Sequence, residues 1–549
     1  MPLQKNQILT LRIERLSSDG SGVAHSADGE AVFVPGTAPG DEARVRIVKD
    51  CGRYAFGILD ELLTPSPDRV PVDCPVAGPC GGCSLRHLDY AAELRAKQES
   101  VLDAFRRIGG LEVPVLNILP SPDVDRYRNK VQFPVGVDKN GAPCIGFFAG
   151  RTHRIVPCPD CKLQPSVLNE IGNALCAFFA RQGIRPYDEQ SGKGLVRHIF
   201  LRRGAHSGQI MVCLVCTRAK LPHAEQLCTA LREQFPAIST ILLNVNAQNT
   251  NVILGSENHI LYGPGYIEDT LCGVPVRLGP LSFYQVNTLA AERLYGVAAQ
   301  YAQLTPDDTL LDLYCGMGTI GLSMAEQCRE LIGVEIVPEA IESAKANAAR
   351  MGKAVAAKSR FFCADAGQAA TQLAAEGLHP DIVMLDPPRK GCDEATLSAV
   401  VRMAPRRVVY VSCNPATAAR DAAWLEQNGY HAEKVQPVDL FPRTKHCETV
   451  VLLSKGEIDS KKVRVEFSLE DMDMSGFQKD ATYEQIKAYV LEHTGLKVSS
   501  LYISQIKRKC GLDVGQNYNL SKKEDAKVPK CPPEKEAAIR DALKYFQMI

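Results

Sequence analysis

The sequence predicts a multidomain α/β protein whose best-defined part is a doubly wound parallel sheet. Between residues 283 and 455, short apolar runs typical of buried strands alternate with helical stretches. Before residue 64, short apolar runs are separated only by turns, which indicates a small β domain. With 549 residues, the chain is also too long for one hydrophobic core, so three or four domains are expected.

The N-terminal domain is expected to span residues 1–63 and to form a small barrel or sandwich. Turns are expected at Ser18-Asp19-Gly20, Asp28-Gly29 and Pro39-Gly40. Strands are expected at the four apolar runs Ile8–Ile13, Ala31–Val34, Ala43–Val48 and Tyr54–Leu59. A proline-rich linker, Thr64–Pro75, then leads into a cysteine cluster.

A central α+β domain is expected over residues 64–282, followed by the doubly wound sheet over residues 283–455. The buried strands of that sheet are expected at Leu310–Leu313, Leu331–Val334, Ile382–Leu385, Val408–Val411 and Val450–Leu453. A charged segment then opens a C-terminal module that covers residues 456–549.

The composition is that of an ordinary globular protein, with 45% hydrophobic and 23% charged residues. Lys+Arg and Asp+Glu are equal at 63 each, so any basic surface for nucleic acid must be local. No apolar stretch approaches the ~18 residues of a membrane span, and the N-terminus does not resemble a signal peptide. A cytoplasmic location is expected, where the 20 cysteines are free thiols, metal ligands or catalytic groups.

A cofactor-binding motif begins at the first expected strand of the doubly wound sheet. The segment Leu311–Gly321 (LDLYCGMGTIG) runs from a strand through a glycine-rich turn into a helix, so a ligand can approach the backbone. The next strand ends at Glu335, which can accept hydrogen bonds from both hydroxyls of a ribose. The short spacing to Glu335, together with Asp386-Pro387-Pro388-Arg389, favours S-adenosylmethionine over NAD. The alternative interpretation is a tight turn without a ligand.

A candidate nucleophile lies at the same edge of the sheet. Ser412-Cys413-Asn414-Pro415 follows the expected strand Val408–Val411. Carbon 5 of uracil becomes nucleophilic only after a group adds to carbon 6, and a thiolate suits that addition because it can later be eliminated. The proton at carbon 5 must then be removed by a base, for which Glu448 and His446 are candidates. The alternative interpretation is a structural cysteine at a strand end.

A cluster of cysteines follows the proline-rich linker. Cys74, Cys80 and Cys83 lie in a glycine-rich segment, and Cys158 and Cys161 follow further along the chain. Four thiolates suit zinc or an iron–sulfur cluster. Zinc sites usually contain two closely spaced cysteine pairs, which these spacings match poorly. Free thiols are the alternative interpretation.

Together these motifs resemble the uracil-5 RNA methyltransferase family, whose bacterial ribosomal members carry an iron–sulfur cluster. The resemblance covers residues from about 6 to 455. It implies that residues 1–63 form a TRAM module, an OB-like RNA-binding β-barrel, and that a Rossmann-like methyltransferase domain follows a central α+β iron–sulfur domain. The ligands of a [4Fe-4S] cluster would be Cys74, Cys80, Cys83 and Cys161, with Cys158 as the rival for the fourth position.

The resemblance also implies roles for residues of the methyltransferase domain. The cofactor would be contacted by Gln285, Tyr314, Glu335 and Asp386, with Asp365 as a weaker candidate near the adenine. Cys413 would be the nucleophile and Glu448 the base, while His446 would position other groups. The basic segment Tyr127–Lys130 would lie near the RNA.

The expected function is therefore methylation of carbon 5 of a uridine in 23S ribosomal RNA, with S-adenosylmethionine and a [4Fe-4S] cluster as cofactors. A monomer without membrane contact is expected. One alternative is a tRNA (uracil-5-)-methyltransferase, although its familiar bacterial form lacks the TRAM module and the cluster cysteines. A radical S-adenosylmethionine enzyme would need a Cys-x3-Cys-x2-Cys motif, which is absent. A non-catalytic RNA-binding protein would have no use for Cys413 and Glu448 together.

The C-terminal module is expected to contain two short helices. The first would be capped by Thr482 and span Tyr483–Glu492, with Gly495 just beyond its end. The second would be capped by Ser499 and end with Lys507, Arg508 and Lys509. The pair resembles a helix-turn-helix, whose basic end could contact RNA phosphates. Alternatively, the three cations only complement the dipole of their own helix.

Overall fold

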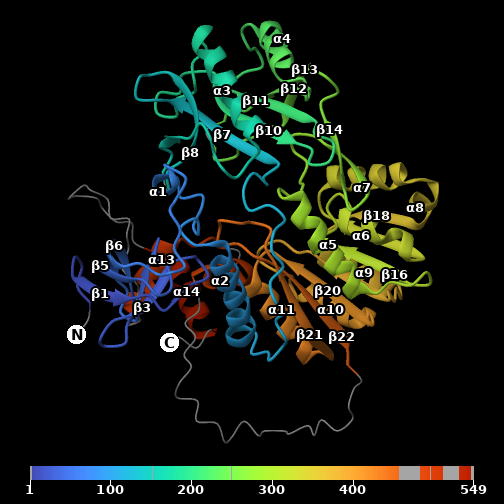
Figure 1. The fold of residues 1–549 in the computed structure, drawn as a ribbon. Helices are drawn as coiled ribbons and strands as arrows, with labels where there is room; N and C mark the ends of the chain where they lie inside the picture. The colour runs from blue at the N-terminus through green and yellow to red at the C-terminus, as the bar shows by residue number, and fades with distance from the viewer. Residues whose placement is uncertain are drawn as a thin grey trace, which may run out of the picture. The chain divides into compact units, whose positions relative to one another are not determined.

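A computed structural model of the chain describes residues 3–150, 152–248, 250–456, 483–494, 496–510 and 531–545. The chain divides into two compact units, Met1–Asp459 and Ser460–Ile549 (Figure 1). Among the described residues, no helix combines the length and the apolar character needed to cross a membrane.

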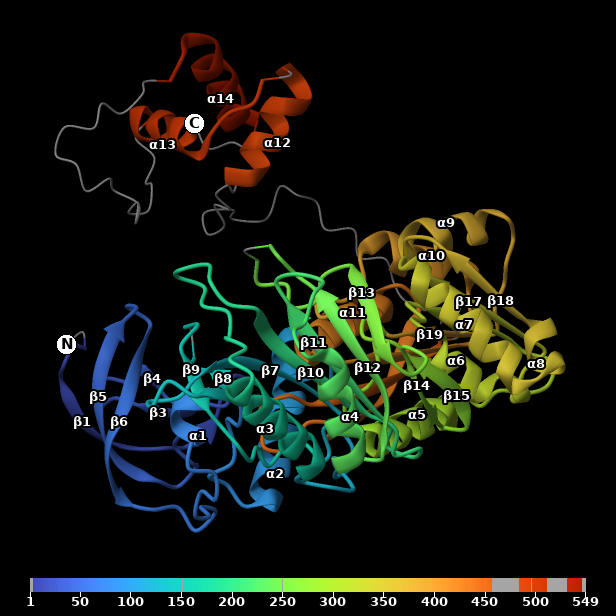
Figure 2. The same ribbon diagram turned by 90° about the horizontal axis from the view of Figure 1, so that it is seen from above.

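The first unit begins with a six-stranded sheet, seen at the left of Figure 2. The strands pair in the order β1-β5-β6-β4-β3-β2 and span Ile8–Arg12 (β1), Arg15–Leu16 (β2), Gly22–His25 (β3), Ala31–Val34 (β4), Glu42–Asp50 (β5) and Tyr54–Thr64 (β6). Alternation along β5 buries Ala43, Val45 and Ile47 in the core of this sheet. The four expected strands are confirmed, whereas the sequence does not predict the short strands β2 and β3.

A short helical segment links this sheet to the next. It contains α1 (Ala77–Cys80), α2 (Tyr90–Asp103) and a single π-helical turn, η1 (Ala104–Ile108). Helix α2 begins where the Asp89 side chain accepts a hydrogen bond from the Ala92 amide at 2.8 Å.

The central part of the first unit is a seven-stranded mixed sheet. Its order is β13-β12-β11-β10-β7-β8-β9, with strands Lys130–Val137 (β7), Pro143–Phe148 (β8), Ile155–Pro157 (β9), Val196–Arg203 (β10), Ile210–Cys216 (β11), Ile238–Val245 (β12) and Glu257–Tyr262 (β13). Helices α3 (Ser166–Arg181) and α4 (Ala224–Gln234) supply apolar residues to the core of this sheet. A hairpin of Ile267–Leu271 (β14) and Val274–Leu278 (β15) follows.

A second seven-stranded sheet forms the last part of the first unit. Its order is β18-β17-β16-β19-β20-β22-β21, with strands Thr309–Leu313 (β16), Glu330–Glu335 (β17), Ser359–Cys363 (β18), Ile382–Leu385 (β19), Arg407–Ser412 (β20), Tyr430–Val438 (β21) and Glu448–Lys455 (β22). The five expected strands are confirmed, and β18 and β21 add to them. The expectation of a wholly parallel sheet is wrong, because β22 runs antiparallel to both of its neighbours.

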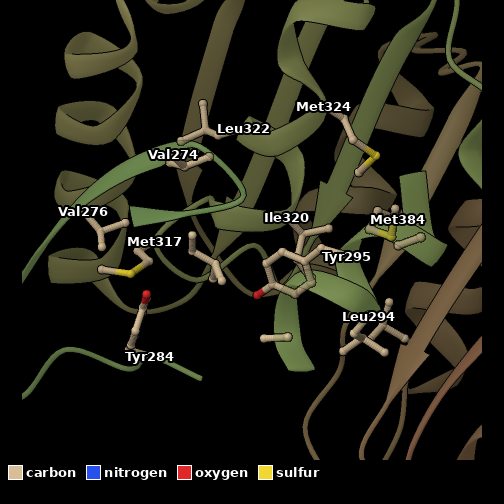
Figure 3. Packing of buried hydrophobic residues seen from close by; sticks show 14 of the residues in the cluster. Val274, Val276, Tyr284, Leu294, Tyr295, Met317, Ile320, Leu322, Met324 and Met384 are labelled. Atoms are coloured by element: carbon tan, nitrogen blue, oxygen red, sulfur yellow. The ribbon is translucent and has the colours of Figure 1, made fainter. Parts of the chain in front are cut away.

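Helices cover both faces of this sheet, as expected for a doubly wound fold. They are α5 (Thr288–Ala302), α6 (Thr319–Met324), the 3₁₀ turn η2 (Ala325–Gln327), α7 (Pro338–Met351), α8 (Lys353–Lys358), α9 (Ala366–Ala375), α10 (Glu394–Met403) and α11 (Pro415–Gln427). Adjacent residues of β16 enter different apolar cores, Leu310 on one face and Leu311 on the other. Figure 3 shows part of the first core, where Tyr295 of α5 lies beside Ile320 of α6.

The second unit contains three described helices, α12 (Tyr483–Thr494), α13 (Ser500–Lys509) and α14 (Pro533–Tyr545). The Ser499 cap of α13 is confirmed, since its hydroxyl accepts a hydrogen bond from the Tyr502 amide at 3.3 Å. The expected cap Thr482 and the expected Gly495 lie outside the described residues. Helix α14, which the sequence motifs do not predict, shares an apolar core with α12 and α13.

Two of the three cations at the end of α13 are engaged within the second unit. Lys507 is buried, with its ammonium 5.2 Å from the ring centre of Tyr483. Lys509 pairs with Glu536 of α14 at 2.6 Å. These contacts hold the helices together and reduce the charge that α13 can offer to an external anion.

Candidate active site

Four of the predicted site residues lie at the carboxyl edge of the β16–β22 sheet. Tyr314 follows β16, Glu335 ends β17, Asp386 follows β19 and Cys413 follows β20. These four strands are parallel, so all of them deliver their last residues to one edge. Ligands of doubly wound sheets bind at this edge.

Glu448 reaches the same edge because β22 is reversed. It is the first residue of β22, and in a wholly parallel sheet it would lie at the opposite edge from Cys413. In the antiparallel ladder, Ser412 of β20 is paired with Thr449 of β22. Cys413 and Glu448 each lie one residue beyond that pair, so the two proposed reacting groups are neighbours across the strands.

The turn after β16 is a strained loop that borders open space. Tyr314 has a positive φ of 65°, which is uncommon for a residue other than glycine. The Gly316 amide donates to Glu335 Oε2 at 3.1 Å, and the Val337 amide donates to Glu335 Oε1 at 3.0 Å. A Cβ placed on Gly316 would meet no atom within 4 Å. The loop can therefore admit a ligand beside Glu335.

Buried carboxyl groups make this edge suitable for a cation. Asp312 Oδ2 accepts a hydrogen bond from the Gly321 amide at 3.0 Å, while its buried Oδ1 has no hydrogen-bond partner among the described residues. Burial raises the pKa of Asp312 to about 8 and that of Asp386 to about 7. A positively charged ligand would stabilise both carboxylates. The sulfonium of S-adenosylmethionine carries such a charge, so the residues fit this cofactor.

The backbone around Cys413 is shaped by its two neighbours. The Ser412 hydroxyl accepts a hydrogen bond from the Asn414 amide at 3.0 Å. The Asn414 side chain caps α11 by accepting from the Ala416 amide at 3.2 Å, and its Nδ2 donates to the Arg389 carbonyl at 2.9 Å. Pro415 takes the first helical position, where it needs no hydrogen-bond partner. These contacts leave the Cys413 side chain half-buried at the start of the helix.

Burial and nearby carboxylates make both Cys413 and Glu448 harder to ionise, and Arg389 makes both easier to ionise. Burial raises the pKa of the Cys413 thiol, and the Glu448 and Asp386 carboxylates raise it further. Burial also raises the pKa of Glu448 to about 8, with Asp386 adding to the rise. The Arg389 guanidinium lowers the pKa of both groups. The sequence motifs assign no role to Arg389, although it follows Asp386-Pro387-Pro388 directly.

Gln285 lies in a segment that connects the central domain to this edge. The Gln285 side chain hydrogen-bonds the hydroxyl of Tyr295, which lies 3.3 Å from the Thr319 hydroxyl at the start of α6. Asn129 donates to the Gln285 carbonyl at 2.7 Å. Tyr295 is not predicted as a site residue, because its helical spacing is also that of a core residue.

Asp365 and His446 occupy supporting positions. Asp365 caps α9, where one carboxylate oxygen accepts from the amides of Gly367 and Gln368 at 3.1 Å each. His446 lies two residues before Glu448, with its ring edge-on to Phe441 at 6.0 Å between ring centres. Burial lowers the pKa of His446, and the cations Arg389 and Lys445 lower it further. A neutral His446 can donate or accept a hydrogen bond near Glu448.

The five predicted cysteines line one cavity of about 390 Å³, although the chain separates them into two groups. The walls of the cavity also contain Arg86, Arg128, Lys130, Lys162 and Val286. The basic segment Tyr127–Lys130 thus contributes to this cavity. Since Val286 follows Gln285, the cavity adjoins the segment that carries a predicted cofactor contact.

Two arginines hold the cysteine segments together. Arg86, three residues after Cys83, is buried and pairs with Asp73 at 2.6 Å and with Asp125 at 2.9 Å. Arg126, beside Asp125, donates to the Cys161 carbonyl at 2.8 Å. In the described part of the chain, however, no three His, Cys, Asp or Glu side chains form a group that could hold a metal ion as they stand. The expected cluster is therefore not shown by this arrangement.

The thiols in this cavity differ in their protonation. Burial raises the pKa of Cys83 to about 12. The Cys158 thiol donates a hydrogen bond to Cys161, which lowers the pKa of Cys161 to about 7 and raises that of Cys158.

Comparisons with known proteins agree with this geometry. Residues 89–456 match the family described as tRNA (Uracil-5-)-methyltransferase, and residues 2–59 match the TRAM domain. An uncharacterized RNA methyltransferase of Halalkalibacterium halodurans is 42% identical over 455 residues, which cover 82% of this chain and 98% of that protein. An uncharacterized RNA methyltransferase of Listeria monocytogenes has the same identity and coverage.

A solved structure is also similar. It is the crystal structure of Pyrococcus abyssi tRNA (uracil-54, C5)-methyltransferase in complex with S-adenosyl-L-homocysteine. The TM-score is 0.65 at 27% sequence identity, and the match covers 81% of this chain and 100% of that chain. The family match extends over more than half of the 549 residues. The chain therefore belongs to the tRNA (Uracil-5-)-methyltransferase family of S-adenosylmethionine-dependent RNA methyltransferases, with a TRAM domain at its N-terminus.

Proposed function

We propose that this chain methylates carbon 5 of a uridine in 23S ribosomal RNA, with Cys413 as the nucleophile and Glu448 as the base. The main support is the reversed strand β22, which brings Glu448 beside Cys413 at the edge that also carries Asp386 and Glu335. A thiol, a buried carboxyl group and an open glycine loop at one edge are the parts that this chemistry requires.

In the proposed reaction, the Cys413 thiol first loses its proton to solvent, and the thiolate Sγ forms a bond to carbon 6 of the uracil. The electrons of the double bond between carbons 5 and 6 move toward O4, and carbon 5 becomes nucleophilic. S-adenosylmethionine, when bound, would supply the methyl group to carbon 5 by cleavage of its sulfur–methyl bond and would be left as the thioether S-adenosyl-L-homocysteine. Glu448 then removes the proton from carbon 5, and the electrons of that bond restore the double bond and expel the Cys413 thiolate. Arg389 favours the ionised forms of both residues.

The cofactor would be held by the residues around the glycine loop. Glu335 would bind the ribose, Asp386 would lie near the sulfonium, and Gln285 and Tyr314 would supply further contacts. The target uracil must leave its stacked position to reach Cys413, because the thiol is only half exposed at the sheet edge.

The choice of 23S ribosomal RNA rests on the TRAM domain together with the cavity of cysteines, since the family resemblance associates both with ribosomal members. Transfer RNA is the second candidate, because the similar Pyrococcus abyssi protein is a tRNA (uracil-54, C5)-methyltransferase. Purified protein should be incubated with labelled S-adenosylmethionine and either unmodified 23S RNA or unmodified tRNA. Nuclease digestion should yield labelled 5-methyluridine from 23S RNA only. Labelled 5-methyluridine in tRNA alone would identify tRNA as the substrate, and the absence of label from both RNAs would contradict the proposed activity.

We also propose that Cys74, Cys80, Cys83 and Cys161 hold a [4Fe-4S] cluster. Five thiols around one cavity, with basic side chains among its walls, suit this group. Ligands of a four-iron cluster lie further apart than ligands of a single ion, so thiols that surround a cavity can suit a cluster without forming a single-ion site. The cluster would tie the Cys74–Cys83 segment to the loop before α3 and stabilise the wall beside Gln285.

Substitution of the proposed ligands should remove the iron. Protein purified without oxygen should be brown and contain about four irons per chain. Cys74→Ser, Cys80→Ser, Cys83→Ser and Cys161→Ser should each lose this colour, while Cys158→Ser should keep it, as measured by visible absorbance and iron analysis. Loss of colour in Cys158→Ser but not in Cys161→Ser would show that Cys158, and not Cys161, is the fourth ligand. Zinc without iron in the native protein would reject the cluster.

Removal of residues 460–549 should leave methylation of a short RNA fragment unchanged, because every proposed catalytic and cofactor residue lies in the first unit. Affinity for long RNA, and its dependence on salt, should change little, since Lys507 and Lys509 are engaged within the second unit. Both quantities can be measured by filter binding over a salt series. A clearly weaker affinity with a smaller salt slope would instead identify the second unit as an RNA-binding module.

A further inference from the structure

A buried group of charges lies at the contact between α2 and the loop that precedes β22. Lys97 Nζ donates to Glu93 Oε1 at 2.7 Å and to Asp439 Oδ1 at 2.8 Å. Lys97 has 2% of its side chain exposed, and the two carboxylates have none. The sequence motifs assign no role to these residues, of which Lys97 and Asp439 are 342 positions apart.

This group holds the connection between β21 and β22 through its backbone. Lys97 Nζ also donates to the Phe441 carbonyl at 3.1 Å, and Asp439 Oδ1 accepts from the Phe441 amide at 3.1 Å. Glu93 Oε1 accepts from the Arg443 amide at 2.7 Å. Three hydrogen bonds to buried side chains thus hold the backbone of the connection at Phe441 and Arg443.

A tyrosine and an asparagine add two further fixed points. The Tyr90 hydroxyl donates to Asp439 Oδ2 at 2.9 Å and accepts from the Ser121 amide at 2.8 Å. Asn287, which ends the segment carrying Gln285, donates to the Leu440 carbonyl at 3.0 Å. The connection therefore receives supports from α2 and from a predicted cofactor segment.

The same connection ends at Glu448. Val438, the last residue of β21, is paired with Glu448, the first residue of β22, so the residues from Asp439 to Cys447 form the turn of a hairpin. His446 lies in this turn, close enough to Lys97 for its charge to act on the imidazole. A displacement of the turn would move the first residue of β22.

We propose that Lys97, with Glu93 and Asp439, is a positioning device that holds Glu448 in place for removal of the carbon-5 proton. Burial of three charges is costly, and hydrophobic side chains could fill the same space at less cost. Ionic groups fix geometry more sharply than apolar contacts, because each bond has a set direction. The inference rests on the proposed covalent mechanism and adds a residue set to it.

The order of the chemical steps makes this role measurable. Glu448 acts after the methyl group has moved, so a misplaced carboxylate leaves the methylated RNA attached to Cys413. A general loss of folded protein would instead reduce all steps equally. The discriminating quantity is the fraction of active enzyme that carries RNA and labelled methyl group as a covalent complex during turnover.

The test variant is Glu93→Gln combined with Lys97→Met. The glutamine at position 93 can still accept a hydrogen bond from the Arg443 amide. The methionine at position 97 fills the space of the lysine stem, and because Glu93 is replaced as well, no carboxylate of α2 loses its ammonium partner. We expect kcat to fall by about 100-fold, since small displacements of catalytic groups have effects of this size. The KM for S-adenosylmethionine should stay within about twofold, and the covalent methylated complex should accumulate.

Arg197→Met is the matched control. Arg197 is also a buried cation, but its partners are the carbonyls of Asn246 and Gln248, outside the hairpin. It should not raise the fraction of covalent complex. If the double variant does not fold, Tyr90→Phe decides, because it removes only the hydroxyl that contacts Asp439 and Ser121. Tyr90→Phe should also increase the fraction of enzyme in the covalent methylated complex.

Two further experiments, one on Glu448→Gln and one on the wild-type protein, distinguish failure of this inference from failure of the proposed function. Glu448→Gln should accumulate the complex, and wild-type protein should be trapped by RNA that contains 5-fluorouridine. If both behave so, and neither the double variant nor Tyr90→Phe accumulates the complex, the positioning role is wrong while the mechanism stands. If neither Glu448→Gln nor the wild-type protein with 5-fluorouridine RNA forms a covalent complex, the proposed mechanism itself is wrong.

Discussion

Cys413→Ala should abolish methyl transfer while leaving S-adenosylmethionine binding nearly intact. Without the thiolate, carbon 5 of the uracil is not activated, and the expected loss is at least about 10⁴-fold in kcat. Cofactor affinity should persist because the proposed contacts, among them Glu335 and Asp386, belong to other strands. Labelled-methyl transfer measures the first quantity, and calorimetric titration with the cofactor measures the second.

A substrate analogue tests the same residue more directly. RNA with 5-fluorouridine at the target position should give a stable protein–RNA complex with wild-type protein, because fluorine cannot leave as a proton does. The complex should be absent in Cys413→Ala. Cys363→Ala is the matched control, since Cys363 is an exposed cysteine at the end of the edge strand β18, which three strands separate from β20, and this variant should trap as wild type does. Full activity in Cys413→Ala would contradict the mechanism.

The sequence predicts the strands of the β16–β22 sheet well because buried strands leave a local signal. Ile382–Leu385 matches β19 to the residue, and Val408–Val411 lies within β20. Strand β18 is missed because its residues are partly or fully exposed at the edge of the sheet, so its apolar run is short. An apolar run marks a strand but not its direction, and for this reason the reversal of β22 could not be predicted.

That reversal carries much of the site. The chemistry expected of Cys413 requires a base nearby, and the family resemblance chose Glu448 over His446 for that role, whereas a parallel sheet would have placed Cys413 and Glu448 at opposite edges. The parallel sheet expected from the pattern of strands and helices was therefore in conflict with the expected chemistry. The antiparallel pairing of β20 with β22 removes this conflict.

Contacts between distant parts of the chain are the other feature that is difficult to predict from the sequence. The cysteines could be noticed in the sequence because the thiols within each of their two segments are closely spaced, and all five do line one cavity. The contact between Lys97 and Asp439 leaves no such signal, since lysine and aspartate are common on surfaces. Arg389 has the same difficulty, because its effect on Cys413 depends on the turn that the Asn414 side chain holds in place.

Glu448→Gln should stop the reaction after methyl transfer. An amide cannot take the carbon-5 proton, so labelled methyl groups should reach the RNA but remain in a covalent complex with Cys413. In wild-type protein, resolution of this complex should speed up as the pH rises toward about 8, because burial raises the pKa of Glu448 to about 8 and only the carboxylate is a base. Quenched single-turnover reactions over a pH series measure both effects, and free methylated RNA from Glu448→Gln at the wild-type rate would exclude this residue as the base.

The raised pKa of Glu448 also predicts that Glu448→Gln stabilises the fold at high pH. This pKa lies near 8 in the folded protein and near the ordinary value of 4.5 in the unfolded chain, so the folded state binds the proton more tightly. The contribution of the protonated group to stability is complete below about pH 4.5. It is lost as the pH rises to about 8, at about 1.4 kcal/mol per pH unit. Glutamine has no proton to lose. In urea unfolding, the variant should gain stability over wild type at about pH 9 and little at about pH 4, and an equal difference at both values would contradict the raised pKa.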